Sequence, residues 1–453
     1  MTIWALLYAM NLTLLKNKLK ESGVIDAIRE VCSDTTECYL VGGAIRDCVT
    51  NRQLNDFDFC FPENPTEYAR RIADNLGATF FILDDERGHS RFVLKNGSGK
   101  LTCDFAPFRA PSLASDLRKR DFTINAMALS CLSGDFELID PLHGYDDLTD
   151  KKLRACSEYS FQEDPLRCLK GIRHAVCMGL EFDPETLERL TDAAPQIDQV
   201  ASERIRIELS RTVAGDNPVK AFELLNQTGL ARELFGPASD DAFVTALAKL
   251  KDLDQVIRTL RSGACGRFIN DYLIESIEEQ VTITAALRMA AFFYGYRPVA
   301  LRSVLSALRF SKRTVNLIEQ LQKLDESTVA SFGDVAVKPR SRARWLASIG
   351  SEPLSCAIFL LLVSPGTVQD NLLQCELLID SFLACSVRGR LTELVDGTWF
   401  TDELGIAEGP EIGRLQALVH QAEISGDVTT PEEARQWLLE HHKSIDNDFE
   451  GNL

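Results

Sequence analysis

Two aspartates separated by a single residue are the first feature that suggests chemistry. Asp56 and Asp58 lie in the segment LNDFDFCF, where polar and aromatic residues alternate. This alternation predicts a β-strand, and side chains two residues apart on a strand point to the same face. Adjacent carboxylates repel each other, and Mg²⁺ prefers one or two carboxylates together with substrate phosphates. We therefore predict that Asp56 and Asp58 are catalytic residues that bind Mg²⁺.

A glycine pair precedes these aspartates and a third carboxylate follows them. Gly42 and Gly43 end the apolar run CYLV and precede a predicted helix that contains Arg46. Backbone N–H groups near a helix start can bind phosphates, so this segment is a candidate triphosphate cradle. Asp104 lies in a later predicted strand, KLTCDFAPF at 100–108. It is a candidate third catalytic carboxylate, as a metal ligand or a general base.

The segment RDFTINAMA at 120–128 contains a second group of polar residues. Asp121 and Asn125 are four residues apart, and their short polar side chains suit ribose hydroxyls. Arg120 suits a phosphate group. We predict that these three residues contact a nucleotide.

A third group lies in FQEDPLRCLKGIRHA at 161–175. The i, i+3 spacing of Asp164 and Arg167 predicts that they share a helix face. A carboxylate beside a guanidinium can imitate a base edge: it accepts from the exocyclic amine of cytosine or adenine, while the guanidinium donates to the ring nitrogen. Uracil and guanine have a carbonyl at that position. Lys170 and Arg173 add positive charge to this nucleotide-binding segment.

These residues require a sheet followed by helices. Residues 38–140 show several strands and two helices, one that begins at residue 44 and one at 64–77, whereas helical periodicity dominates from about residue 160. The predicted class is α+β, with a small mixed-sheet head followed by an all-helical neck, body and tail. The predicted parts are an N-terminal helical extension at 1–30, the head at 31–145, a base-reading neck at 146–215, a body at 216–330 and a tail at 331–453.

Composition excludes several classes of protein. The 453 residues are 45% hydrophobic and 26% charged, which excludes wholesale disorder, and no apolar run is long enough to span a membrane. The apolar start MTIWALLYAM lacks a basic segment and is interpreted as a ragged helix or an early start codon. The thirteen cysteines include no C-x-x-C pair, which indicates reduced thiols in the cytoplasm.

The net charge of −18 argues against nucleic acid as a partner, but it is unevenly distributed. Basic windows occur at 109–120, 151–173 and 299–345, the last including KPRSRAR at 338–344. Each window could be a solvated helix face. Beside the predicted catalytic motif, we interpret them as surfaces that hold RNA phosphates.

The blocks GGAIRD…NDFDF, RDFTINAMA, DPLHGYDDL, EDPLRCLKGIRHA and SERIRIEL together resemble the bacterial-type (class II) tRNA nucleotidyltransferase and poly(A) polymerase family. The resemblance covers roughly residues 38–215. It implies two-metal nucleotidyl transfer from CTP or ATP to the 3′ end of tRNA, held by its acceptor arm. It also implies metal ligands at Asp56 and Asp58, a base template at Asp164 and Arg167, and a bracing helix that begins at 202–204. Lys170 and His174 depart from the family's usual Arg and Phe.

The linker before RDFTINAMA is short. Only the six residues APSLAS connect Arg109 to Asp116, whereas many relatives have a longer flexible loop that is associated with the switch from cytosine to adenine. At about 3.6 Å per residue, six residues cannot also reach the neck. We therefore predict an enzyme of the CC-adding subgroup. One alternative is a CCA-adding or A-adding enzyme in which the shortened loop has no effect on specificity. The others are a poly(A) polymerase, a nucleotidyltransferase head that acts on a small molecule or protein, and a noncatalytic RNA-binding protein.

Overall fold

The computed structural model describes most of the chain. The described residues are 13–33, 36–52, 54–96, 99–132, 137–263, 265–298, 300–324, 345, 349, 352–363, 375–380, 382, 394–407, 409–425 and 427–448. The apolar start at 1–10 and the basic run at 338–344 lie outside them. The chain divides into two compact units, one formed by residues 1–201 with 224–233 and the other by residues 202–223 with 234–453. The domain boundaries predicted from the sequence remain predictions.

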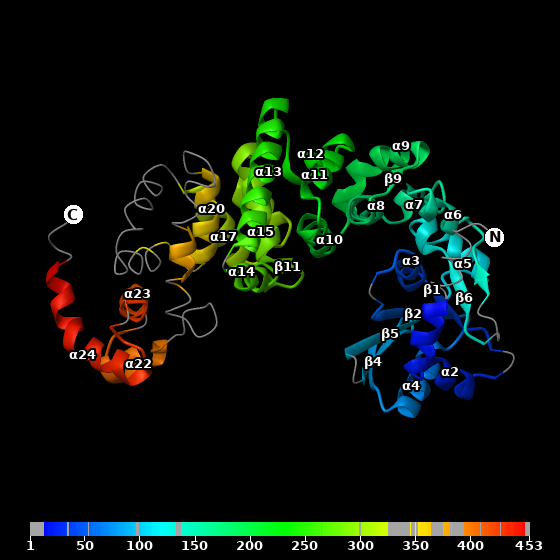
Figure 1. Ribbon diagram of the computed structural model, residues 1–453, viewed down its shortest axis with the longest axis horizontal. Coiled ribbons are helices and arrows are strands. Elements are labelled where there is room, and N and C mark those ends of the chain that lie inside the picture. The colour runs from blue at the N-terminus through cyan, green and yellow to red at the C-terminus, as the bar shows by residue number, and fades with distance from the viewer. Residues whose placement is uncertain are drawn as a thin grey trace. The chain divides into compact units, whose positions relative to one another are not determined.

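The first unit is built on a seven-stranded mixed sheet (Figure 1). Its spatial order is β3-β4-β5-β2-β1-β6-β7. The strands are β1 Tyr39–Val41, β2 Asp56–Phe61, β3 Thr79–Asp84, β4 His89–Asn96, β5 Gly99–Pro107, β6 Ala128–Ser130 and β7 Leu138–Ile139. Strands β2 and β5 pair in parallel, and the other neighbouring strands pair antiparallel. The predicted mixed sheet is confirmed, and the alternation in LNDFDFCF forms β2.

Alternation along β2 separates an apolar face from a polar face. Phe57, Phe59 and Phe61 are buried, whereas Asp56 and Asp58 are exposed. The apolar face is covered by helix α4, Pro65–Leu76, whose Tyr68 stacks on Phe61 with ring centroids 5.0 Å apart. Burying each phenylalanine contributes about 1.5–3 kcal/mol. This packing fixes the strand so that both carboxylates lie on the opposite face.

The rest of the first unit consists mainly of short helices. They are α2 Val24–Val31, α3 Gly43–Val49, α5 Leu113–Arg118, α6 Gly144–Thr149, α7 Ser160–Glu163, α8 Leu166–Met178 and α9 Pro184–Ala193, with 3₁₀ turns η1 Thr123–Asn125 and η2 Ala194–Gln199. A Cβ atom at Gly171 of α8 would lie 2.8 Å from Phe122. Glycine therefore permits the close approach of α8 to the segment that contains Asp121, despite a helix-propensity cost of about 1 kcal/mol.

The second unit is mostly helical, as predicted. Its helices are α10 Ser202–Ala214, α13 Asp240–Ser262, α14 Gly266–Leu273, α15 Ile283–Tyr296, α16 Leu301–Ala307, α17 Lys312–Gln322, α20 Pro353–Val363, α22 Gly397–Leu404, α23 Pro410–Ser425 and α24 Pro431–Asp448; α11 Pro218–Gln227 and α12 Leu230–Phe235 cross the boundary between the units. Helix α15 is buried along nearly its whole length.

Two short two-stranded ladders were not predicted from the sequence, because strands of two or three residues are too short to show an alternating pattern. They are β8 Lys152–Leu153 with β9 Glu181–Phe182 in the first unit, and β10 Ser276–Glu278 with β11 Val281–Thr282 in the second.

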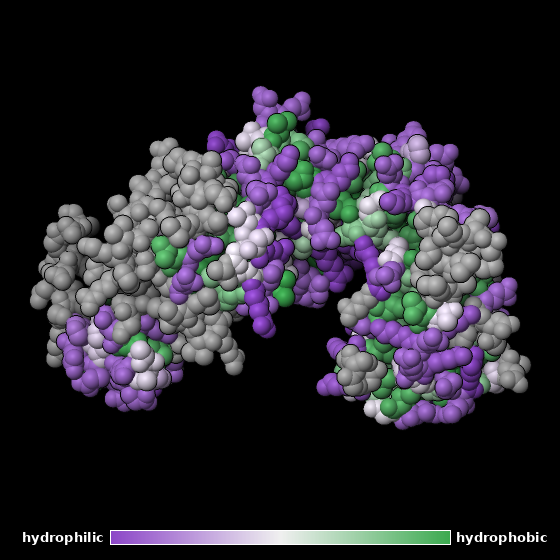
Figure 2. All heavy atoms as spheres, in the orientation of Figure 1, coloured by the Kyte–Doolittle hydropathy of each residue, from purple (hydrophilic) through white to green (hydrophobic). Residues whose placement is uncertain are grey.

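The polarity of the surface and the state of the cysteines are as the composition suggests. Figure 2 shows hydrophilic side chains over much of the visible face, with hydrophobic areas between them. Among the described residues, no helix is long and apolar enough to cross a membrane. The twelve cysteines in the described part of the chain are free thiols.

Candidate functional site

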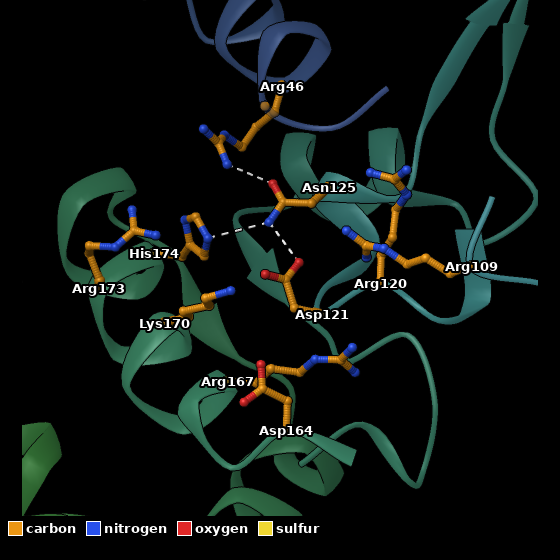
Figure 3. A pocket seen from close by; sticks show the side chains of 11 residues that line it. Arg46, Arg109, Arg120, Asp121, Asn125, Asp164, Arg167, Lys170, Arg173 and His174 are labelled. Carbon is orange, nitrogen blue, oxygen red and sulfur yellow. Dashed lines mark hydrogen bonds between the residues drawn. The ribbon is translucent and has the colours of Figure 1, made fainter. Parts of the chain in front are cut away.

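A cavity of about 380 Å³ lies in the first unit, and six of the side chains around it are cationic (Figure 3). Its lining consists of Gly43, Arg46, Arg109, Arg120, Asp121, Asn125, Asp164, Arg167, Lys170, Arg173 and His174. Only two of these residues are acidic, so the lining has an excess of four positive charges when the histidine is neutral. A cavity with this charge suits a polyanion such as a triphosphate. It brings together most of the nucleotide-binding residues predicted from the sequence.

Of the predicted glycine pair, Gly43 lines the cavity and Gly42 does not. Gly42 has φ 75°, a backbone conformation that favours glycine, and Gly43 begins α3. A Cβ atom at Gly42 would lie 3.4 Å from Asp58 Oδ2 and 3.5 Å from Arg120 Nη1. Gly42 therefore lies between the acidic strand and the basic cavity. Its own N–H donates to Met127 O over 3.4 Å.

Asn125 connects the elements around the cavity. Its Oδ1 accepts from Arg46 Nη1 over 2.6 Å, and its Nδ2 donates to Asp121 Oδ1 over 2.9 Å and to His174 Nε2 over 3.3 Å (Figure 3). Arg46 also pairs with Asp47. The predicted pair Asp121 and Asn125 is thus brought together, and the amide joins α3, η1 and α8.

The pKa values of the two titratable neighbours of Asn125 are both lowered, for different reasons. Burial alone would raise the pKa of the Asp121 carboxyl, but the charge of Lys170 and hydrogen bonds from Asn125 and the Phe122 N–H hold that pKa below its usual range. Burial, with the nearby cations Arg173 and Arg46, lowers the pKa of His174 well below its usual value. At neutral pH, Asp121 is therefore ionised and His174 is neutral.

The basic wall next to β5 is organised by a buried carboxylate. Asp116 is 0% exposed, and its Oδ2 accepts from Arg120 Nε and Nη2 over 3.1 and 2.9 Å. Its Oδ1 accepts from the Arg109 backbone N–H over 2.8 Å. The short linker between them is further fixed because Ser112 and Ser115 form a capping box at the start of α5. Burial and the charge of Arg120 lower the pKa of Arg109.

The predicted base-reading pair also lines the cavity, with one difference from the prediction. Arg167 is on α8, but Asp164 precedes that helix in extended backbone, with φ −150° and ψ 96°. Pro165 explains this, because the residue before a proline is disfavoured in helical conformation. The Arg167 guanidinium donates to Ser160 O and Oγ over 3.1 and 2.9 Å and to Lys119 O over 2.7 Å. These bonds hold the guanidinium at the cavity.

The predicted catalytic carboxylates lie on the sheet beside the cavity. Asp58 of β2 is directly opposite Asp104 of β5 in the parallel register, and Asp56 is opposite Thr102. Both oxygens of Asp104 accept from Arg91 of β4, from Nε over 2.6 Å and from Nη2 over 2.8 Å. None of the three carboxylates lines the cavity itself. Asp56 and Asp58 therefore form an acidic pair next to Asp104, whose charge is already neutralised by Arg91.

The electrostatics of Asp58 suit a cation. Although the side chain is solvent-accessible, surrounding protein atoms withdraw water from its carboxyl, and this desolvation, together with the negative charge of Asp104, raises the pKa of Asp58 to about 6. A divalent cation would relieve both effects. Within the described residues, no cluster of three or more His, Cys, Asp or Glu is arranged to hold a metal. The available donor set is thus two carboxylates, which fits Mg²⁺ completed by substrate phosphates.

Sequence reasoning did not assign site roles to Arg91, Arg109, Asp116 and His174. Arg91 falls on the carboxylate face because β4 pairs antiparallel with β5, and this register was not predicted. Asp116 and Arg109 were noticed only as part of a basic window and a short linker. Helix α10 in the second unit begins with the predicted bracing residues, Ser202, Glu203 and Arg204.

Two family descriptions match the chain. Residues 38–154 match the "Poly A polymerase head domain", and residues 179–243 match the "Probable RNA and SrmB-binding site of polymerase A". The first match includes the glycine pair, the acidic strand and the segment of Asp121 and Asn125. The second match lies C-terminal to α8.

Curated relatives extend the similarity along the chain. A CC-adding tRNA nucleotidyltransferase of Geobacter sulfurreducens is 33% identical over 88% of this chain and 91% of its own length. One from Synechocystis is 26% identical over 89% of this chain and 94% of its own length. The fold is similar to that of a solved Thermotoga maritima CCA-adding enzyme complexed with tRNA, with TM-score 0.60, 22% identity, and coverage of 93% of this chain and 95% of that one.

Proposed function

Since this chain belongs to the tRNA nucleotidyltransferase and poly(A) polymerase family, we propose that it adds two cytidines from CTP to the 3′ end of tRNA and then stops. Addition of nucleotides to a tRNA 3′ end is the activity of the family members that align along most of its length. The observation that carries the assignment is the basic cavity beside the acidic strand. A binding protein would gain no affinity for RNA from paired carboxylates next to phosphates.

The cavity is the proposed site of the nucleoside triphosphate. Arg46, Arg109 and Arg120 would bind phosphate oxygens, with Lys170 and Arg173 from α8. In the reaction, the RNA 3′ oxygen attacks the α-phosphorus, the bond to the oxygen that bridges to the β-phosphate breaks, and pyrophosphate leaves. The barrier is lowered mainly by positioning and by stabilising charge on the phosphates. The excess of positive charge around the cavity supplies that stabilisation.

Asp56 and Asp58 are the proposed metal ligands, and Mg²⁺ is the proposed ion. Divalent metals are general in this family. Such an ion, when bound, lowers the pKa of the RNA 3′-hydroxyl and neutralises charge on the triphosphate. Asp104 is held by Arg91 with both oxygens, so its proposed role is to complete the acidic cluster from outside the pair.

Asp164 and Arg167 are the proposed template for the base. Both line the cavity. Arg167 is fixed by Ser160 and Lys119, so its remaining N–H groups have a defined direction. Asn125 and Asp121 would contact the ribose, since they hold each other next to Arg46.

The proposed stop after two cytidines rests on the linker before η1. The six residues between Arg109 and Asp116 are closed by the hydrogen bond from Arg109 N to Asp116 Oδ1 and by the Ser112 cap of α5. A segment fixed at both ends cannot act as a lever that shifts the template toward adenine. The two relatives that align along most of this chain are named CC-adding, which supports the same specificity.

A single assay tests this function. Purified full-length protein is given tRNA that ends at the discriminator nucleotide, with CTP and ATP together, and products are resolved at single-nucleotide resolution. The expected product is two nucleotides longer than the substrate. A terminal adenosine would show that the enzyme adds CCA. An enzyme that adds no cytidine to this substrate but extends a substrate already ending in CC with ATP would instead be an A-adding or poly(A) enzyme.

A further inference from the structure

The carboxylate face of the sheet continues beyond the acidic pair to the edge of the sheet. Asp58 is opposite Asp104, Asp104 is opposite Arg91, and Arg91 is opposite Phe81 of β3. Side chains of directly opposed residues point to the same face, so these four form one row across β2, β5, β4 and β3. With strands about 4.8 Å apart, the row runs roughly 14 Å from Asp58 to the edge strand.

The outer half of this row is open to solvent and has an unusual composition. Phe81 is 47% exposed, although a phenylalanine is a costly residue to leave in water. Arg91 keeps 40% of its side chain exposed while it binds Asp104. An exposed aromatic ring beside a guanidinium is the combination on which unpaired nucleic-acid bases stack.

A second row on the same face carries two positive charges. Lys95 of β4 and Lys100 of β5 are directly opposite each other and both are exposed. Each lies four residues from a member of the first row on its own strand, so the two lysines share the face of Arg91 and Asp104. Like charges directly opposed across strands are destabilising, and a bound polyanion removes that cost.

We propose that this open face, formed by Phe81, Arg91, Lys95 and Lys100, binds the single-stranded 3′ end of the RNA primer. The inference rests on the proposed function and adds a second substrate subsite to it. A base of the primer stacks on Phe81, and the lysines bind backbone phosphates. The row that contains Phe81 and Arg91 continues to Asp58, so an RNA strand bound with its 3′ end toward β2 places its 3′-hydroxyl at the acidic pair, while the triphosphate occupies the basic cavity.

Phe81→Ala and Ile82→Ala form a matched pair of variants that tests this proposal. Ile82 is the next residue of β3 and is 46% exposed, but strand alternation places it on the opposite face. CTP incorporation is measured against primer tRNA concentration and, separately, against CTP concentration. Phe81→Ala should raise the KM for tRNA at least about fivefold, as expected for one lost stacking contact. The KM for CTP should remain within about twofold, and Phe81→Trp should retain the wild-type KM for tRNA.

The possible outcomes separate the two proposals. Equal KM values for tRNA in the two alanine variants would overturn the primer subsite while leaving the nucleotidyl transfer of the wild type intact. A wild-type protein that incorporates no nucleotide would overturn the proposed function. Lys95→Gln with Lys100→Gln adds a second readout: tRNA affinity should depend less steeply on salt than in the wild type, because two phosphate contacts are lost. If the dependence of tRNA affinity on salt concentration were unchanged, the two lysines would not be part of the subsite.

Discussion

Asp58 and Asp104 lie directly opposite each other in the parallel register of β2 and β5, but only Asp104 is neutralised by an arginine. Arg91 binds both oxygens of Asp104, and Asp58 keeps a carboxyl whose pKa is raised to about 6. One strand pair thus holds a satisfied carboxylate next to one that needs a cation. This asymmetry has measurable consequences.

The stability of the metal-free protein should report the raised pKa of Asp58. In the unfolded chain an aspartate has a pKa of about 3.9, so between pH 4 and 6 the folded state binds more protons at Asp58. Ionisation of this group therefore makes unfolding easier as the pH rises through that window. In EDTA, the melting temperature of the wild type should fall relative to that of Asp58→Asn as the pH rises from 4 to 6. A stability difference that is independent of pH would contradict the raised pKa.

Magnesium should reverse that stability difference. At pH 7.5 the wild-type Asp58 is ionised, and a bound cation stabilises the folded state in proportion to its occupancy. Added Mg²⁺ should raise the melting temperature of the wild type. It should leave unchanged the melting temperature of the double variant that carries both Asp56→Ala and Asp58→Asn. Asp85→Ala, which removes an exposed carboxylate from the β3–β4 turn, is the matched control and should respond as the wild type does. Equal responses of all three proteins would reject the assigned ligands.

Asp56→Ala or Asp58→Ala should abolish nucleotide incorporation while tRNA affinity changes little. Removing a preorganised electrostatic group of this kind typically costs about 10²–10³-fold in rate. Single-turnover incorporation and a filter-binding measurement of tRNA affinity check the two parts separately. Activity within about tenfold of wild type in either variant is inconsistent with a catalytic role.

Arg167→Ala should lose nucleotide discrimination more than RNA binding. Arg167 is fixed at the cavity wall by Ser160 and Lys119, and a bidentate base contact contributes about 1–3 kcal/mol of discrimination. The preference for CTP over UTP, measured as a ratio of kcat/KM values, should fall accordingly. Arg189→Ala, which removes a partly exposed arginine of α9 that pairs with Glu185, is the control. A preserved CTP preference in Arg167→Ala would exclude the template role.

Asp116→Ala should destabilise the first unit and disorganise the basic wall of the cavity. The substitution leaves the largely buried guanidinium of Arg120 without its carboxylate, and breaking such a pair costs about 3–5 kcal/mol. Denaturant unfolding measures this loss. Asp116→Asn keeps an acceptor for the Arg109 N–H but not the charge, so it should recover part of the stability. A loss below 1 kcal/mol in Asp116→Ala would show that the pair is not structurally important.

Local pattern determined much of this protein. Alternation in LNDFDFCF was enough to place Asp56 and Asp58 on one face of β2, because the period of a strand is a property of consecutive residues. The glycine pair, the basic segment of α8 and the change from strands to helices were likewise readable along the chain. The order of these blocks sufficed to indicate the family.

Contacts between distant residues were decided only by tertiary structure. The register of β4 against β5 brings Arg91 to Asp104, and that of β3 against β4 brings Phe81 to the end of the same row. Register depends on hydrogen bonds between strands rather than on the composition of either strand. The closeness of Asn125 to Arg46 and His174 depends on the docking of α3 and of α8, and Gly171 permits the close approach of α8. Asp164 leaves the helix because Pro165 excludes it, so even a correct spacing gave the wrong local geometry there.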